Sequence, residues 1–87
     1  MPPLNNKPLP RTSLEPVCAA LAMVIKARRE KAEMSLNQLA TRTNLSRPMI
    51  RFIENSERIP TVDTVARISR AFRIPSGRPV AEAENKL

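Results

Sequence analysis

An all-α fold is predicted for this chain by three observations. Apolar residues recur three or four positions apart in successive segments, which is the spacing of one helix face. Ser or Thr stands at the start of these segments, where its side chain can cap a helix. No run alternates apolar and polar residues as a strand does, and one glycine among 87 residues leaves no glycine-rich hairpin. A chain of this length forms one compact domain.

The first helix is expected to begin at Ser13, its N-cap, and to run to about Ala32. Pro16 then falls in the first turn, where its missing N–H has no intrahelical partner. One stripe of this helix is apolar and consists of Leu14, Val17, Leu21, Val24 and Ile25. Cys18 lies among these residues, and we interpret it as a packing side chain rather than a reactive thiol.

Three more helices are predicted, each behind a hydroxyl side chain. Ser35 precedes a helix over residues 36–43. Ser46 precedes a helix that runs to about Asn55, and Thr61 precedes the fourth. The apolar side of the fourth helix consists of Val62, Val65, Ile68, Ala71 and Phe72. Its outward arginines, interpreted as solubilising charge, are Arg67, Arg70 and Arg73.

Composition divides the chain into three parts. Residues 1–12 contain four of the nine prolines and no apolar periodicity, so they are predicted to form a disordered or extended Pro-rich arm. Residues 13–78 form the domain. Residues 79–87 form a short tail or a last helix that begins at Pro79, with Val80, Ala83 and Leu87 on one side.

The side-chain inventory argues against an enzyme, a metal site or a cofactor. The sequence has no His, Trp or Tyr and one Cys, so the usual metal-ligand clusters and Ser–His–Asp arrangements cannot be built. The uncharged run over 17–25 resembles the core of a signal peptide, but it is too short to span a bilayer and no small-residue cleavage site follows it. We therefore expect a cytoplasmic, nucleoid-associated protein without a membrane partner.

The charge balance indicates a polyanionic partner. Lys and Arg total 15 against 8 acidic residues, which gives a formal net charge of +7. Such a surplus attracts polyanions and accelerates encounter with them. Charge alone does not separate DNA from RNA or from an acidic membrane surface.

The most informative segment is residues 36–55. On a helical wheel, the apolar side of its second helix consists of Met49, Ile50 and Ile53, joined by Glu54. The opposite arc consists of Arg47, Pro48, Arg51, Phe52 and Asn55. Asn44 can end the preceding helix in the left-handed conformation, because its short side chain tolerates positive φ. Two short helices joined by such a turn form a helix-turn-helix, which presents its second helix to the DNA major groove.

Four segments of the sequence carry a resemblance to a known family. They are Ser35-Leu-Asn-Gln-Leu-Ala40, Asn44-Leu-Ser46, Ile53-Glu-Asn55 and Pro60-Thr-Val-Asp-Thr64. Together they resemble the phage repressor and Cro (xenobiotic response element type) family of helix-turn-helix transcriptional regulators. The resemblance covers about residues 21–74 and implies a five-helix, lambda-repressor-like DNA-binding domain, acting as a homodimer on a palindromic operator.

Two further features follow from the resemblance. It implies a structural ion pair between Arg29 and Glu54, without a DNA contact. It also implies glycines at four positions that this chain fills otherwise, with Glu33, Asn44, Ser56 and Arg73. Asn is an easy substitute, whereas Glu33 and Arg73 must adopt a less favoured backbone or shift the helix ends.

Base contacts are assigned to one arc of the recognition helix. Arg47 and Arg51 are the candidate base readers, since arginine is the commonest reader of guanine. Pro48 is expected to shape the helix start beside them, and Phe52 either touches a thymine methyl group or tucks against the protein. The residues expected to position the DNA backbone are Ser35, Gln38, Arg42, Ser46, Asn55 and Arg58, of which Arg42 and Arg58 are otherwise solvated rim charges.

The favoured function is a sequence-specific regulator of transcription that binds double-stranded DNA, most simply as a repressor. One alternative is the antitoxin of a toxin–antitoxin pair, which would need a surface for its toxin partner. Another is a protein-interaction module that keeps the fold without binding DNA, since fold alone does not establish function. A homodimer would use the C-terminal segment, where Ile74, Val80 and Leu87 could pair across a two-fold axis.

Overall fold

The computed structural model describes residues 11–87, and this part of the chain is entirely helical. Its five helices are α1 (Arg11–Lys31), α2 (Leu36–Thr43), α3 (Arg47–Glu54), α4 (Val62–Ala71) and α5 (Arg78–Asn85). No strand occurs within the described residues. The predicted all-α fold is confirmed.

Hydroxyl caps set the starts of the three central helices. The side-chain oxygens of Ser35, Ser46 and Thr61 each accept a hydrogen bond from the backbone N–H three residues later, at 3.0, 3.2 and 3.1 Å. Each cap satisfies an N–H that the first helical turn leaves without a partner. The predicted starts of α2, α3 and α4 are therefore correct.

The first helix begins earlier than predicted. It starts at Arg11, so Ser13 lies inside the helix and the predicted cap is wrong. Pro16 consequently lies beyond the first turn, where its missing N–H removes one bond of the helical ladder. The prediction of a Pro-rich arm over 1–12 falls outside the described residues, except for Arg11 and Thr12, which are helical.

The first four helices all end in the same way, on a residue other than glycine with positive φ. These residues are Glu33, Asn44, Ser56 and Arg73, with φ of 57°, 59°, 60° and 59°. After each of them the next N–H bonds to the carbonyl five residues back, over 2.8 to 3.1 Å. This bond is characteristic of the Schellman helix end, in which glycine usually supplies the left-handed residue. Glu33 and Arg73 thus adopt the less favoured backbone instead of shifting the helix ends.

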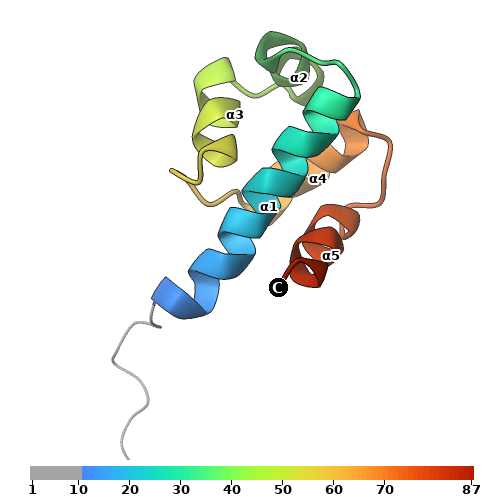
Figure 1. Cartoon of the computed structure of the whole chain (residues 1–87). Coiled ribbons are helices and arrows are strands. Elements are labelled where there is room, and N and C mark those ends of the chain that lie inside the picture. Colours follow the sequence, from blue (N-terminus) through green and yellow to red (C-terminus); the bar gives the residue numbers. More distant parts are fainter. Residues whose placement is uncertain (1–10) are drawn as a thin grey trace, which may run out of the picture.

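Helix α1 lies at the centre of the molecule and organises the core. Figure 1 shows α3 on one side of α1, α5 on the other, and α2 across its C-terminal end. Each of the first four helices contributes at least one fully buried aliphatic side chain, and α3 contributes two: Ile25, Leu39, Ile50, Ile53 and Ile68. Thr43 is also buried, and its hydroxyl donates to the carbonyls of Leu39 and Ala40. Val62 differs from the predicted apolar side of α4, because it is 87% exposed.

Helix α5 packs back onto α1 instead of standing free. Pro79 and Ala83 are buried, and Val80 packs against the core. Ile74, just before α5, is half-buried as well. Val80 is thus half-buried against its own protomer, and the expected dimer contact through Ile74, Val80 and Leu87 stays a prediction. Leu87 alone of the three is exposed.

Candidate nucleic-acid interface

Helix α3 is held in place by its inner face. Ile50 and Ile53 are 0% and 2% exposed, and Met49 is half-buried beside the core. Eight residues make a helix too short to be stable alone, so this packing is what keeps α3 folded.

A buried ion pair fixes the C-terminal end of α3 to α1. Arg29 Nε donates to Glu54 Oε2 at 2.7 Å, and Nη2 donates to Oε1 at 3.1 Å. The same guanidinium donates from Nη1 to the Met34 carbonyl at 2.8 Å. The hydrogen bond with Glu54 raises the pKa of Arg29, so the guanidinium keeps its charge. Arg29 thus joins α1, α3 and the loop before α2.

The outer arc of α3 is free of the rest of the molecule. Arg47, Pro48, Arg51 and Asn55 are all exposed, as predicted from the helical wheel. Within the described part of the chain, no hydrogen bond or ion pair engages the side chains of Arg47, Arg51 or Asn55. Pro48 occupies the first turn, where a proline fits without loss of a helical bond. Two guanidinium groups one turn apart are thus available to an external partner.

Phe52 shares this arc but is partly covered. Its side chain is 39% exposed, and Arg58 Cζ lies 5.7 Å from the centre of its ring. A guanidinium at this distance over an aromatic face makes a cation–π contact. Arg58 therefore reaches back from the loop after α3 to this arc, and Phe52 is both exposed and in contact with the protein.

The predicted positioning residues near α2 have structural partners of their own. Gln38 Oε1 accepts from the Ser35 N–H at 2.8 Å while Ser35 Oγ accepts from the Gln38 N–H, which makes a capping box. The amide nitrogen of Gln38 is left as a donor, which suits a phosphate oxygen. Ser46 Oγ is similarly engaged at the start of α3, while Asn55 ends that helix as its C-cap.

Arg42 lies beside one other candidate, Gln38, with which it lines a shallow depression on α2. It is exposed near the C-terminal end of α2, where it lines one groove with Arg67 and Arg70 of α4 and another with Arg73. No α3 residue lines either groove. The structure thus brings Arg47, Arg51, Asn55 and the Phe52–Arg58 pair together on α3 and the loop after it, while Arg42 lies on α2 between Gln38 and the arginines of α4.

Two contacts were not foreseen from the sequence. One is the Phe52–Arg58 contact. The feature of the sequence that could have indicated it is an arginine six residues after an aromatic residue on a polar arc. The other joins Arg28 on α1 to Glu82 on α5, with Arg28 Nε donating to Oε1 at 2.9 Å. Since these two residues are 54 positions apart, no local pattern indicates their contact.

Other kinds of site find no support in the described residues. No group of three His, Cys, Asp or Glu side chains in this part of the chain is arranged to hold a metal ion. None of the helices in residues 11–87 is both long and apolar enough to span a membrane.

Comparison with known proteins points to the same segment. A family model described as helix-turn-helix, of the Cro/C1 type, matches residues 25–77, more than half of the chain. Two curated relatives, from Mycobacterium tuberculosis strains CDC 1551 and H37Rv, are each named an HTH-type transcriptional regulator and are 36% identical to the chain over 50 residues. The match covers 58% of this chain and 36% of each relative, so the chain spans about a third of their length. No solved structure matches the chain significantly.

Proposed function

Since the chain belongs to the Cro/C1-type helix-turn-helix family, we propose that it binds double-stranded DNA sequence-specifically through α3 and represses transcription. The observation that carries this proposal is the outward arc of α3, where Arg47 and Arg51 are exposed while Ile50 and Ile53 hold the helix from behind. The names of the two curated relatives support a role in transcription.

The arc has the chemistry that base reading requires. A guanidinium group can donate two parallel hydrogen bonds to O6 and N7 of guanine in the major groove. Arg47 and Arg51 are one helical turn apart, so they would address neighbouring bases. Asn55 and Arg58 flank the arc at the end of α3, where contacts to the phosphate backbone would set the register of the helix on the duplex.

A homodimer is part of the proposal. Two copies related by a two-fold axis, with their α3 helices about 34 Å apart, would occupy successive major grooves on one side of the duplex. Such a dimer would select an operator with inverted symmetry. Sedimentation of the intact chain with and without its selected DNA measures this directly, and a monomer under both conditions would contradict it.

Selection of bound sites from random duplex DNA by the intact chain is the first experiment. The expected result is one enriched sequence with two related half-sites. Recovery of no preferred sequence, with binding that depends only on salt, would leave phosphate attraction as the whole interaction and would contradict sequence-specific binding.

Arg51→Ala tests the assignment on the selected site. The loss of a bidentate base contact is expected to cost about 1–3 kcal/mol and to relax selectivity at one position. The matched control is Arg78→Ala, which removes an exposed arginine from α5 and is expected to change affinity little. An equal loss on selected and unrelated DNA would show that Arg51 contacts phosphate instead of a base.

A further inference from the structure

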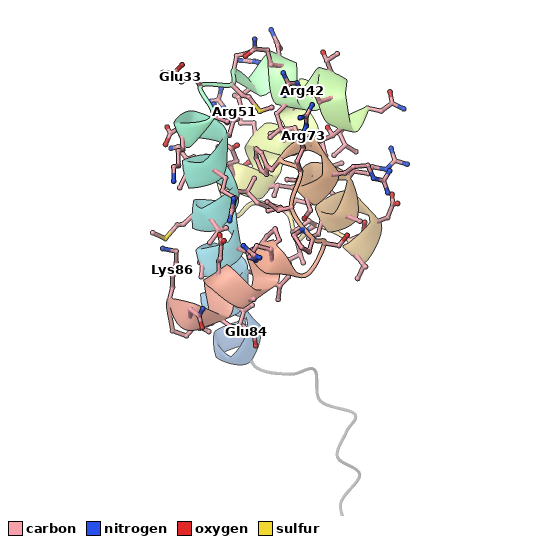
Figure 2. The ribbon with its side chains drawn as sticks, turned by 90° about the vertical axis from the view of Figure 1, so that its right-hand side faces the viewer. Glu33, Arg42, Arg51, Arg73, Glu84 and Lys86 are labelled. Carbon is pink, nitrogen blue, oxygen red and sulfur yellow. The ribbon has the colours of Figure 1, made fainter. Side chains whose placement is uncertain are left out.

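A second arginine-rich surface lies on the side of the molecule away from α3. Figure 2 shows this side, with Arg42 and Arg73 labelled near the ends of α2 and α4. Here the C-terminal ends of α1 and α4 meet α2 around an open groove of about 340 Å³. We call this the basic groove. Its charged rim consists of Arg28, Lys31, Arg42 and Arg73, and its accessible apolar lining consists of Ala32, Ala71 and Phe72, with the buried Met34 beneath them.

Most of the rim charge is unbalanced. Of the four basic side chains, Arg28 alone has a carboxylate partner among the described residues, namely Glu82. A second open depression of about 360 Å³ shares Arg42 with the groove and adds Arg67 and Arg70, of which Arg67 is paired with Asp63. The basic surface therefore extends across α2 and α4, and no arginine of α3 lines either depression.

Helix electrostatics account for part of this arrangement. Lys31 and Arg42 lie in the last turns of their helices. A positive charge there is attracted to the backbone carbonyls that the helix end leaves unpaired. Arg73 is different, because it lies beyond α4 and holds a left-handed backbone in which a side chain is costly. A strained residue retained on an otherwise open surface is a reason to look for a function of its side chain.

We propose that the basic groove binds an acidic segment of a partner protein, with carboxylates on the rim and apolar side chains over Ala32 and Phe72. A DNA duplex is convex and stiff, so its phosphates could reach the rim but could not cover the apolar lining. A second copy of this chain is a weaker occupant. Its Glu54, Asp63 and Glu82 are already paired with arginines, and each of the other exposed acids among the described residues lies within two residues of a Lys or Arg, namely Glu30, Glu33, Glu57 and Glu84. The proposal does not depend on DNA binding by α3.

The geometry gives this interaction a distinctive consequence. Because no residue of α3 lines the groove, an acidic segment in the groove leaves the arc of Arg47 and Arg51 uncovered. Partner and DNA are therefore expected to bind at the same time.

Fluorescence anisotropy with the intact chain tests the proposal. The probe is a short labelled peptide rich in Glu and Leu, and its control is the same peptide with every Leu replaced by Ser. The Glu/Leu peptide is expected to bind more tightly, because only it covers Ala32 and Phe72 with apolar side chains. Equal binding of both peptides would mean that only charge attracts them and that the apolar lining plays no part, which would overturn the proposal.

The decisive variant is Arg42→Gln combined with Arg73→Gly. It removes two rim charges, and the glycine also relaxes the left-handed backbone, so the variant is not expected to fail to fold. Peptide binding is expected to weaken about tenfold, at a few-fold for each exposed charge. The matched control is Lys26→Gln, which removes an exposed charge of α1 outside the groove.

Two results would overturn the assignment of the site. One is unchanged peptide binding by the groove variant, which would leave its basic residues with only a helix-end role. The other is displacement of the peptide by duplex DNA that the chain has selected, which would place the peptide on the DNA-binding face. Simultaneous binding, with peptide affinity lowered only by the groove variant, is the supporting result.

Discussion

Arg28 and Arg29 are neighbours on α1, yet they hold opposite sides of the molecule in different ways. Arg29 binds Glu54 of α3, and these two side chains are 12% and 4% exposed. Arg28 binds Glu82 of α5, and those side chains are 28% and 31% exposed. Successive residues on a helix point about 100° apart, so one position of sequence is enough to direct the same chemistry to two different partners.

The difference between these pairs is one of water access. Loss of one partner from a buried pair leaves a charge without compensation, which is strongly destabilising. The partner of a solvated pair is rehydrated at little cost. We therefore expect α3 to be held far more firmly than α5, with the firm contact placed behind the face that carries Arg47 and Arg51.

Loss of the buried pair should have the largest effect. Glu54→Ala leaves Arg29 without its carboxylate, and we expect the free energy of unfolding to fall by about 3–5 kcal/mol. Denaturant unfolding followed by circular dichroism measures this. Glu57→Ala, which removes an exposed acid just after α3, is the control and should change stability by less than about 0.5 kcal/mol. If Glu54→Ala lowered stability as little as this control, the ion pair would not be what holds α3 to α1.

The positive-φ residues Glu33 and Arg73 provide a second comparison between the α3 side and the α5 side of the molecule. Glu33 precedes Met34, whose carbonyl Arg29 binds, whereas Arg73 lies between α4 and α5. Replacing either with glycine should stabilise the protein by about 1 kcal/mol, because glycine adopts positive φ without steric cost. Thermal unfolding measures the gain. Asn44→Gly is the control and should gain less, since Asn tolerates this conformation; no gain for Glu33→Gly would show that the end of α1 is not strained.

The solvated pair should have the smallest effect, and one that depends on pH. Its hydrogen bond with Arg28 lowers the pKa of Glu82, so the carboxylate stabilises the fold above its unfolded pKa of about 4.3. This contribution is lost as the pH falls through the lower folded pKa. Glu82→Gln is expected to cost less than about 1 kcal/mol at neutral pH. Unfolding midpoints measured over a pH series should converge with those of the native chain at acid pH, and a constant gap would contradict the assignment.

The parts of the fold that the sequence predicts well are those with local signals. The starts of α2, α3 and α4 follow from Ser35, Ser46 and Thr61, because a cap acts within one turn. The start of α1 was mistaken since Ser13 looks like a cap but lies inside a longer helix. The position of α5 depends on Arg28 and on the core, which are distant in sequence, so its short polar pattern gave no reason to dock it on α1.

The arc of α3 was predictable because burial of Ile50 and Ile53 determines which residues point outward. The contact between Phe52 and Arg58 was not, because the loop after α3 has no periodic pattern that shows where it turns. Arg42 is predicted to position the DNA because its charge lies near the recognition helix, and that role stays a prediction. Its place in the basic groove depends on how α4 packs against α2, which no single segment reveals.

The separation of the two faces of α3 also bears on how this protein can change over evolutionary time. The inward residues that stabilise the helix and the outward residues that meet a partner are different side chains, and within the described chain Arg47, Arg51 and Asn55 have no internal hydrogen-bonding role to lose. Substitutions at these three positions can therefore accumulate at little cost in folding. The domain is well suited to acquire new operator preferences by a few changes on one surface.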